Sequence, residues 1–403
     1  MLNQAVFLVG GLGTRLKDRT RDTPKPLLDV GGRPFLDYLL DEAARHGFTE
    51  ILLLAGHFGQ QVEERYRGRD WRGARIKVLC EPEPLGTGGA LRFALPDLAD
   101  QFLLANGDSF FDINLRSLPP ILPEGGVAMA LRNVAGDRYG RVKFQDGQVL
   151  SFHAPEEGME GPINGGVYAL SRKVVEAIGG GKVSLEGDIF PQLAAKGLIR
   201  GRQFDGYFID IGVPLDFERA QQDLPRRTRR PAVFFDRDGV LNRDIGYLHR
   251  PGDVEWLEGA KTAVRLCNDA GYFVFVVTNQ AGVARGYYGE EDVHKLHAWM
   301  NAELALQSAH VDAFEYCPHH PDGVDGPYRR PCRRRKPEPG MLLDLLSSWP
   351  VDKNASFLVG NMQSDLDAAA GAGLKAHLYQ GGDLAGFVAA RLISTQAATP
   401  PVA

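Results

Sequence analysis

Two aspartates lie two positions apart, directly after a short apolar run in the second half of the chain. Asp236 and Asp238 follow residues 232–235. Residues two apart on an extended segment point the same way, so both carboxylates can converge on one site. Like charges that close repel each other and need a cation between them. The pair therefore predicts a magnesium site, with a simple turn as the alternative for two aspartates taken alone.

Further polar side chains accompany later apolar runs of the same half. Thr278 and Asn279 end one run, Lys336 precedes an expected helix, and Asn361 and Asp365 follow another run. Hydroxyl, amide and ammonium groups can hold phosphoryl oxygens, and carboxylate or amide oxygens can bind a hard cation. This series predicts a site that handles a phosphate group with a metal ion.

The first half opens with a glycine-rich loop, residues 10–15, after the apolar run 5–9. Glycines there let backbone amides approach phosphate oxygens, and Arg15 adds a fixed positive charge. Lys25 lies between two prolines, which restrict its backbone, and it can neutralise a second phosphate. A plain glycine turn and an exposed loop lysine are the alternatives for each feature in isolation.

Two carboxylates of the first half could hold a metal ion beside such phosphates. Asp108 follows the apolar run 102–105, and Asp210 ends a later run. A carboxylate at the carboxyl end of a parallel strand lies where open α/β sheets bind ligands, and it suits Mg²⁺. An aspartate at a strand end is often only a turn former, but two acids that share one metal favour the functional interpretation.

Strands and helices of an α/β fold must position these side chains. Residues 5–9 and 51–55 are short apolar runs, and residues 35–46 between them carry a helical apolar period. This βαβ opening predicts a mainly parallel sheet covered by helices. Residues 225–231 are rich in arginine and proline without apolar periodicity, as is typical of an exposed linker, and the strand–helix pattern restarts after them. The predicted boundaries are 1–224 for a first domain, 225–231 for the linker, 232–394 for a second domain and 395–403 for a flexible tail.

Composition limits the class of protein. The chain has 403 residues, 44% of them hydrophobic and 24% charged, which predicts two or three soluble globular domains. Its net charge of -5 gives no general attraction to nucleic acid or membrane, although the basic segment 329–336 could hold a small anion. With four cysteines and no signal-peptide pattern, we expect a cytoplasmic protein with small-molecule partners. Nothing in the sequence indicates an oligomeric state.

The first half resembles the sugar-nucleotide pyrophosphorylase family. The glycine-rich loop, Pro-Lys-Pro, Pro-Leu-Gly-Thr, Gly-Asp, Asn-Gly-Gly-Val-Tyr and Asp-Ile-Gly recur in order over about residues 1–222. The resemblance implies a Rossmann-like mixed sheet, on which an oxygen of a sugar 1-phosphate attacks the α-phosphorus of a nucleoside triphosphate and expels pyrophosphate. No protein nucleophile is needed, since positioning and charge neutralisation, with Arg15 and Lys25 taking part, supply the rate.

The same resemblance implies roles for individual residues. It implies nucleotide contacts from Gly10, Gly11, Gly13, Thr14, Arg15, Lys25, Gly86, Thr87 and Gly107. It implies magnesium ligands at Asp108 and Asp210, and sugar contacts from Asn164, Gly165, Glu186 and Asp188. Members often carry Glu-Lys-Pro after a phenylalanine, where the lysine holds the sugar phosphate, but here Phe152 precedes His-Ala-Pro. Lys143 or Lys182 could replace that lysine, or the contact is missing.

The second half resembles the haloacid dehalogenase-like phosphatases, and so a second doubly wound α/β domain is expected. The resemblance implies that Asp236 forms an aspartyl phosphate and that Asp238 protonates the leaving alcohol and then activates water. Thr278 and Lys336 would stabilise the phosphoryl oxygens. It implies magnesium ligands at Asp236, Asp238, Asn361 and Asp365, and substrate contacts from Asn279, Arg285 and Arg335. Asn361 stands where the family has an aspartate, and its amide oxygen brings no charge.

Within that family the similarity is closest to the heptose bisphosphate phosphatases, with the histidinol phosphate phosphatases as rivals. It rests on residues 236–242, 246–249, 278–286, 317–320 and 335–337. Relatives of both kinds carry a structural zinc on Cys-x-His and a later Cys-x-Cys. Here Cys317, His319 and Cys332 fill three places, and Arg334 occupies the fourth. Three ligands cannot close a tetrahedral site, and an arginine beside Zn²⁺ is repulsive, so zinc binding stays open.

Together the halves predict a bifunctional enzyme of nucleotide-activated heptose synthesis. A phosphatase that converts a heptose 1,7-bisphosphate into the 1-phosphate would supply the nucleotidyltransferase, and resemblance to that pathway implies GTP as the donor. One alternative is a mannose or glucose 1-phosphate nucleotidyltransferase fused to a histidinol-phosphate-type phosphatase. Another is a regulatory module that binds sugar nucleotides and has one decayed site.

Overall fold

The computed structural model describes residues 2–11, 13–134, 138–155, 161–324 and 326–397. The chain forms two compact units, an N-terminal unit, Met1–Arg226, and a C-terminal unit, Arg227–Ala403. The division falls in the segment expected to be an exposed linker, but helix α6 (Pro214–Arg227) continues into it and Arg230 is buried. The helix persists because Phe217, Ala220 and Leu224 form one apolar stripe packed on the core, which the local arginine and proline content does not reveal.

The sheet of the N-terminal unit is mixed, as predicted. Its parallel part contains β7 (Gln101–Asn106), β1 (Gln4–Leu8), β4 (Glu50–Ala55) and β6 (Ala74–Cys80), in that order. Antiparallel to β7 runs β12 (Pro162–Ser171), followed in the sheet by β9 (Val127–Asn133), β13 (Ile199–Phe204), β11 (Gln148–His153) and β10 (Arg141–Gln145). Short strands pair as β5 (Asp70–Trp71) with β6, β8 (Ser109–Phe111) with β14 (Phe208–Asp210), and β2 (Asp29–Val30) with β3 (Arg33–Pro34).

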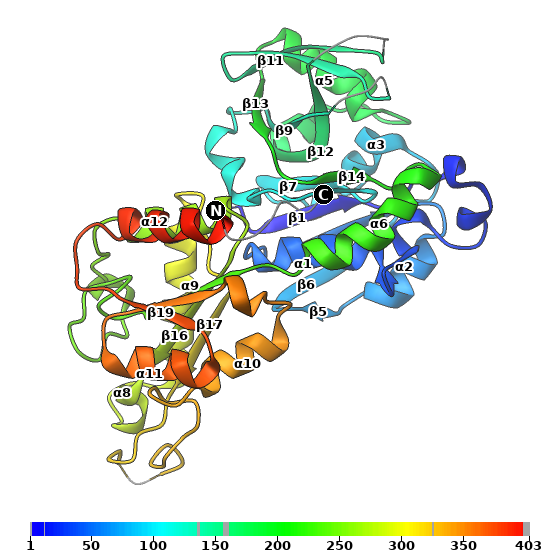
Figure 1. Ribbon diagram of the computed structural model, residues 1–403. Coiled ribbons are helices and arrows are strands. Elements are labelled where there is room, and N and C mark those ends of the chain that lie inside the picture. Colours follow the sequence, from blue (N-terminus) through cyan, green and yellow to red (C-terminus); the bar gives the residue numbers. More distant parts are fainter. Residues whose placement is uncertain (1, 12, 135–137, 156–160, 325, 398–403) are drawn as a thin grey trace. The chain divides into compact units, whose positions relative to one another are not determined.

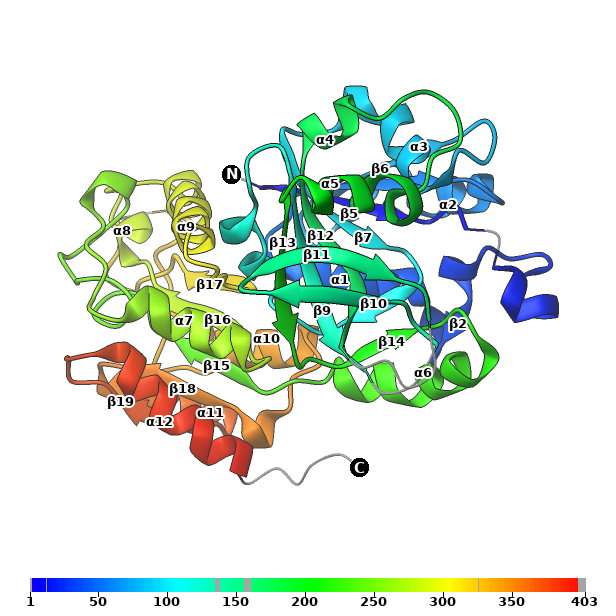
Figure 2. The ribbon, with the colours of Figure 1, turned by 90° about the horizontal axis from the view of Figure 1, so that it is seen from above.

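Helices cover both faces of this sheet, because alternate residues of the strands point into two separate hydrophobic cores. Ala5 and Phe7 of β1 join one core, and Val6 joins the other. The first core includes residues of α1 (Phe35–Arg45), α2 (Gly59–Tyr66) and α6. The second includes residues of α3 (Gly86–Phe93), α4 (Arg172–Glu176) and α5 (Phe190–Ala195). Figure 2 shows α5 beside β11.

The C-terminal unit is a doubly wound parallel sheet. Its strands are β17 (Ala313–Cys317), β16 (Phe273–Asn279), β15 (Ala232–Phe235), β18 (Phe357–Gly360) and β19 (Lys375–Leu378), in that order. One face packs on α7 (Ala260–Asp269), α12 (Leu384–Ala397) and part of α9 (Glu290–Ala305), and the other on α10 (Gly340–Ser348) and α11 (Gln363–Ala372). Figure 1 shows α12 and α11 on opposite faces. The single-turn helix α8 (Ala281–Ala284) follows β16.

The C-terminal end of the chain differs in part from the expected flexible tail. Helix α12 extends through residues 395–397 of the segment expected to be a flexible tail, and residues 398–403 lie outside the described residues. None of the described helices combines the length and apolar character that a membrane span requires.

Candidate active sites

A cavity of about 320 Å³ opens at the carboxyl ends of the parallel strands in the N-terminal unit. Of the predicted site residues, those that line it are Gly10, Gly11, Lys25, Gly86, Thr87, Gly107, Asp108 and Glu186. Those that do not line it are Gly13, Arg15, Asn164, Gly165, Asp188 and Asp210. Gly13 begins a 3₁₀ helix, Thr14–Thr20, on which Arg15 is exposed. Thr14 also lies on this helix, and its side chain is outside the described part of the structure.

Lys25 brings the two predicted metal-binding carboxylates together. Its Nζ donates to Asp108 Oδ2 at 2.6 Å and lies 3.7 Å from Asp210 Oδ1. Burial raises the pKa of Asp210, and the nearby Asp108 charge raises it further, against the opposing effect of Lys25. Arg138 lies 3.3 Å from Asp210 Oδ2. Two converging carboxylates that already need cationic partners fit a Mg²⁺ ion.

Two glycines are needed where backbone segments approach each other closely at this cavity. A Cβ on Gly107 would lie 2.5 Å from Leu8 O, and the Gly107 amide donates to the same oxygen at 2.9 Å. Gly86 has a φ of 74°, and a Cβ there would lie 2.6 Å from Val183 O. Only glycine fits either position without displacing the chain. These contacts place the ends of β7 and β1, and the start of α3, around the cavity.

Glu186 reaches the cavity through a bond to the start of α3. Thr87 Oγ1 donates to Glu186 Oε2 at 2.9 Å and accepts from Leu185 N at 2.8 Å. Asp188, by contrast, accepts from Ser184 N at 2.8 Å, so it caps the short helix Leu185–Ile189.

The other two predicted sugar contacts, Asn164 and Gly165, lie on β12. Other side chains of the protein occupy the space next to them. Asn164 donates to the hydroxyl of Tyr168 at 2.7 Å and accepts from Gly166 N at 3.0 Å. A Cβ on Gly165 would lie 2.6 Å from the Phe111 ring. Among the predicted sugar contacts, Glu186 is thus the one that lines the cavity.

The cavity also contains one of the two lysines named as a replacement for the missing lysine, and a glutamate that the sequence motifs did not assign. Lys182 lines it, whereas Lys143, the other candidate to replace the missing lysine, is exposed on β10 and does not. Glu81 lines it as well and was not foreseen. It comes directly after β6, as Asp108 comes soon after β7, and this strand-end position was a signal that could have identified it.

A second cavity, of about 480 Å³, opens at the carboxyl ends of the strands in the C-terminal unit. The predicted residues that line it are Asp236, Asp238, Thr278, Asn279, Arg335, Lys336, Asn361 and Asp365. Arg285 does not line it. Gln280, which follows Thr278 and Asn279 in the polar stretch expected to face a phosphoryl group, also forms its wall, as does Tyr288, which the sequence motifs missed.

Lys336 connects the carboxylates of this second site. Its Nζ lies 2.8 Å from Asp236 Oδ1 and 2.6 Å from Asp365 Oδ1, and donates to Val277 O at 2.9 Å. Burial raises the pKa of Asp236 to about 6 against the opposing charge of Lys336, and the charge of Asp365 adds to the rise. The group is buried and crowded with negative charge, as a cation-binding site requires.

A hydrogen-bond network fixes the orientation of Asp238. The buried Arg237 holds its Oδ2 through Nη2 at 2.9 Å, and Asn242 Nδ2 donates to its Oδ1 at 2.9 Å. Gln280 Nε2 donates to Thr278 Oγ1 at 2.9 Å and lies 3.3 Å from Asp238 Oδ2. The Gln280 amide is oriented in turn by Tyr288, which donates to its Oε1 at 2.8 Å. Asp238 and Thr278 are therefore held by one network.

Asn279, which we expected to contact the substrate, lines the cavity and is also bonded to the backbone of Lys336. Its amide donates to Lys336 O at 3.0 Å and accepts from Lys336 N at 3.1 Å. Both polar groups of the side chain are thus used by the backbone of Lys336. The residue holds the lysine in place at the cavity wall.

Asn361 supports the fit of a magnesium ion to this site. Its Oδ1 is buried without a hydrogen-bond partner among the described residues. Gly239 packs against the amide, since a Cβ there would lie 2.2 Å from Asn361 Nδ2. Asp365 Oδ2 accepts from Asn361 N at 3.1 Å and fixes the loop. A buried oxygen without a donor, beside Asp236 and Asp238, is a suitable ligand for a hard cation.

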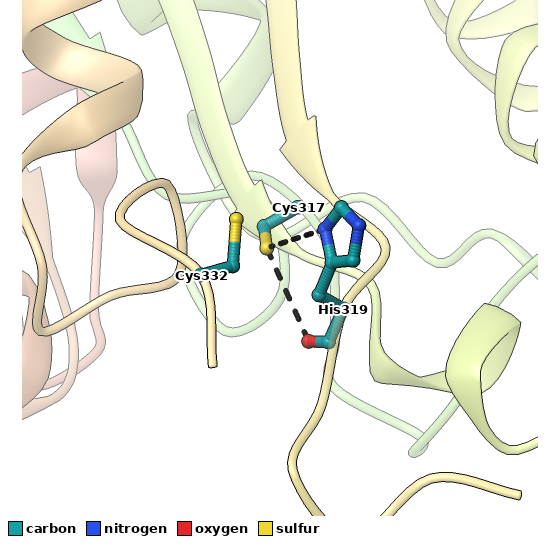
Figure 3. A group of neighbouring side chains, drawn as sticks. All are labelled: Cys317, His319 and Cys332. Carbon is teal, nitrogen blue, oxygen red and sulfur yellow. Dashed lines mark hydrogen bonds between the residues drawn. The ribbon is translucent and has the colours of Figure 1, made fainter. Parts of the chain in front are cut away.

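The three predicted zinc ligands lie together: the ligand atoms of Cys317, His319 and Cys332 are all within 4.8 Å of one another. Figure 3 shows Cys317 Sγ facing the His319 ring, at 3.8 Å from Nδ1. Burial raises the pKa of the Cys317 thiol to about 12, and the neighbouring Cys332 contributes to the rise. These side chains could supply three ligands to a metal ion, and no fourth His, Cys, Asp or Glu joins them within the described residues.

Arg334 repels zinc less than its place in the sequence suggested. Its guanidinium forms an ion pair with Glu315 and lies 3.3 Å from Asp344 Oδ2, so these carboxylates compensate its charge. Arg330 opposes zinc more directly, because its Nη2 lies 2.9 Å from His319 Nε2. Zinc on Nδ1 would require a proton on Nε2, which would then face a guanidinium donor.

Comparisons with known proteins agree with this division of the chain. A model of the family described as Nucleotidyl transferase matches residues 4–227. The chain is 36% identical to a D-glycero-alpha-D-manno-heptose 1-phosphate guanylyltransferase of Campylobacter jejuni, over 53% of this chain and 96% of the relative. It is 47% identical to a D-glycero-beta-D-manno-heptose-1,7-bisphosphate 7-phosphatase of Rhodopseudomonas palustris, over 42% of this chain and 94% of the relative. The crystal structure of HddC from Yersinia pseudotuberculosis complexed with GMP-PN is similar with a TM-score of 0.50 and 31% identity, over 55% of this chain and 100% of that chain.

Proposed function

The chain belongs to the nucleotidyl transferase family over residues 4–227 and to the heptose-1,7-bisphosphate 7-phosphatases in its C-terminal part, and on this premise we propose that it is a bifunctional enzyme of activated-heptose synthesis. The C-terminal unit removes the 7-phosphate of D-glycero-D-manno-heptose 1,7-bisphosphate. The N-terminal unit transfers GMP from GTP to the resulting heptose 1-phosphate and releases pyrophosphate. The observation that carries the proposal is the presence, on one chain, of two lysine–carboxylate centres, each beside a cavity at the carboxyl edge of its own sheet.

In the phosphatase reaction, the Asp236 carboxylate attacks the phosphorus of the 7-phosphate. The bond from phosphorus to the sugar oxygen breaks, and Asp238 donates its proton to that oxygen. Asp238 then takes a proton from water, which attacks the aspartyl phosphate and releases inorganic phosphate and free Asp236. Lys336 and Thr278 hold the phosphoryl oxygens throughout. The network through Arg237 and Gln280 keeps Asp238 in place for both proton transfers.

Two arginines favour a bisphosphate over a monophosphate substrate. Burial lowers the pKa of Arg335, and the nearby Arg285 charge lowers it further against the effect of Cys317. Neither guanidinium forms an ion pair within the described residues, and Arg285 Nε is buried without a hydrogen-bond partner there. A second phosphate would neutralise this pair of like charges beside the cavity. Histidinol phosphate has no second phosphate to offer.

In the nucleotidyl transfer, an oxygen of the heptose 1-phosphate attacks the α-phosphorus of GTP. The bond to the oxygen between the α- and β-phosphorus breaks, and pyrophosphate leaves. Gly10, Gly11 and Lys25 hold the triphosphate in the cavity. Gly13, Thr14 and Arg15 come next in the same loop and contact the far end of the triphosphate. Lys182 takes the sugar phosphate, since it lines the cavity and no carboxylate pairs with it in the described part of the chain.

Asp108 with Asp210, and Asp236 with Asp238 and Asn361, are the residues that would hold magnesium, with Asp365 beside the second set. When bound, Mg²⁺ supplies positive charge against the phosphate oxygens at both sites.

Separate assays on the intact protein test the two activities. Phosphate release from heptose 1,7-bisphosphate is compared with release from histidinol phosphate and from heptose 7-phosphate. We expect the bisphosphate to have the highest kcat/KM, because the other two lack the second phosphate. Pyrophosphate release is followed for heptose, mannose and glucose 1-phosphates with GTP. A preference for histidinol phosphate, or for a hexose 1-phosphate, would contradict the heptose assignment.

A further inference from the structure

His297 is a buried residue of α9 that the mechanism above does not use. Its ring stacks on the ring of Phe314, a residue of β17, with the two centroids 4.5 Å apart and an angle of 18° between the planes. The Tyr316 ring lies edge-on to it, at 6.0 Å between centroids. A polar ring that is shielded from water in this way needs a hydrogen-bond partner inside the protein.

That partner is Arg237, the residue between the two catalytic aspartates. His297 Nε2 lies 3.3 Å from Arg237 Nη1. A guanidinium only donates, so Nε2 must accept, and the ring proton is then on Nδ1. Burial lowers the pKa of His297 well below its ordinary value, and the nearby charges of Arg237 and His294 lower it further. His297 is therefore neutral at neutral pH, as an acceptor must be.

Each nitrogen of the Arg237 guanidinium has an acceptor of its own. Nε and Nη2 both donate to the Asp238 carboxylate, and Nη2 also donates to Leu248 O at 2.9 Å. Nη1 is left for His297. Because Arg237 is fully buried, an Nη1 without an acceptor would be costly, and the guanidinium would turn to find another one. His297 therefore helps to fix the plane in which Arg237 meets Asp238.

We propose that His297 is a positioning residue of the phosphatase, which acts through Arg237 to hold Asp238 in the orientation that protonates the leaving sugar oxygen. The inference rests on the proposed phosphatase reaction and adds a residue of α9 to it. Proton donation depends on the distance and direction between donor and acceptor, so a small rotation of Asp238 would slow it. No motif includes His297, because 60 positions separate it from Arg237.

The leaving group of the substrate separates this role from a merely structural one. The sugar oxygen of heptose 1,7-bisphosphate needs a proton as its bond to phosphorus breaks, whereas nitrophenolate leaves p-nitrophenyl phosphate as a stable anion. The value of kcat/KM reports the steps up to formation of the aspartyl phosphate, in which this proton is donated. Comparison of kcat/KM for the two substrates, at saturating Mg²⁺, therefore isolates the general acid.

His297→Leu removes the acceptor and keeps a buried apolar side chain. Since a general acid contributes about 10²- to 10⁴-fold, kcat/KM for the bisphosphate should fall by roughly 10-fold or more. For p-nitrophenyl phosphate it should fall by less than about twofold, because that reaction does not use the acid. Equal losses for both substrates, or no loss for either, would overturn the proposal.

Two further variants serve as controls. His297→Gln offers Oε1 to Arg237 in place of Nε2, so it should keep most of the wild-type ratio of the two kcat/KM values. His294→Leu should leave the ratio unchanged, since His294 is exposed on the same helix and bonds to Tyr316 instead. A glutamine variant as impaired as the leucine variant would also overturn the proposal.

Neutron diffraction from crystals of the full chain in D₂O tests the hydrogen bond itself and requires no variant. We expect the deuteron of the His297 ring on Nδ1, with Nε2 facing Arg237, and a deuteron on Nε2 would overturn the inference. A wild type that hydrolyses histidinol phosphate but not the bisphosphate would instead overturn the proposed substrate. Histidinol phosphate also has an alcohol leaving group, so the same comparison with p-nitrophenyl phosphate would then test His297.

Discussion

At the level of single residues, both centres place one lysine between two carboxylates. Lys25 lies between Asp108 and Asp210, and Lys336 between Asp236 and Asp365. The lysine compensates part of the negative charge in a buried place before a metal ion or a phosphate arrives. Removal of one partner leaves the remaining charges without compensation. Substitutions here should therefore lower the activity more than they alter the fold.

Asp108→Asn should lower pyrophosphate release by roughly 100-fold or more, because it removes a proposed metal ligand and the charge that orients Lys25. Phosphate release should stay near the wild-type rate, since Asp236 and its partners lie in the other unit. Asp205→Asn is the control, because its side chain is almost fully exposed and does not line the cavity. Loss of both activities in a folded Asp108→Asn variant would show that the two sites are not independent.

Asn361→Asp should let the phosphatase work at a lower Mg²⁺ concentration, since it adds a negative charge to a buried ligand position. We expect the Mg²⁺ concentration for half-maximal phosphate release to fall by roughly threefold or more, in line with the gain of about one unit charge. The same variant should unfold at a lower temperature than the wild type in the presence of a chelator. An unchanged Mg²⁺ dependence would remove Asn361 from the metal site.

Protein purified without chelator should contain less than one equivalent of zinc per chain. Three ligand side chains lie together, but Arg330 Nη2 lies next to Nε2 of the His319 ring. Arg330→Ala should therefore retain more zinc than the wild type in elemental analysis after dialysis. A full equivalent in the wild type would mean that another group completes the coordination.

At the level of elements, the strand ends beside the cavities could be predicted, because an apolar run followed by glycine, aspartate or a short polar stretch is a local pattern. The strand-end positions of Asp108, Asp236 and Thr278 were predicted in this way. The pairing of Thr87 with Glu186 could not be predicted, since 99 residues separate them and the contact depends on how α3 meets a later turn. The continuation of α6 past Pro225 was missed because core packing outweighs local composition there.

Gly86→Ala tests whether the cavity requires the backbone conformation at the start of α3. The added methyl group would meet Val183 O at 2.6 Å, in a backbone conformation that alanine disfavours. We expect a loss of about 1–3 kcal/mol in the unfolding free energy of the N-terminal unit and a lower kcat/KM for the sugar phosphate. Gly179→Ala is the matched control, because a Cβ there meets nothing within 4 Å. Equal melting temperatures for the two variants would show that the turn is adaptable.

At the level of the whole molecule, the sequence predicted two α/β units with unrelated motifs, and two separate compact units are observed. The choice of ligand within each cavity depends on how residues far apart in the sequence come together. Arg285 and Arg335, both expected to contact the substrate, are 50 positions apart in the sequence, and the effect of the Arg285 charge on Arg335 is evident only in the folded unit. Glu81 was overlooked because a single glutamate after a strand is common, and its exposure to the cavity depends on the two glycines beneath it, Gly10 and Gly56.

The central claim is that the two activities act in sequence on one sugar. The intact protein is given heptose 1,7-bisphosphate, GTP and Mg²⁺, and phosphate, pyrophosphate and GDP-heptose are measured together in the wild type and in Asp236→Asn. This variant keeps nearly the same side-chain shape but lacks the nucleophilic carboxylate. We predict that the wild type forms all three products, and that Asp236→Asn stalls on the bisphosphate but still converts heptose 1-phosphate into GDP-heptose. Formation of GDP-heptose from the bisphosphate by the variant at the wild-type rate would contradict the account.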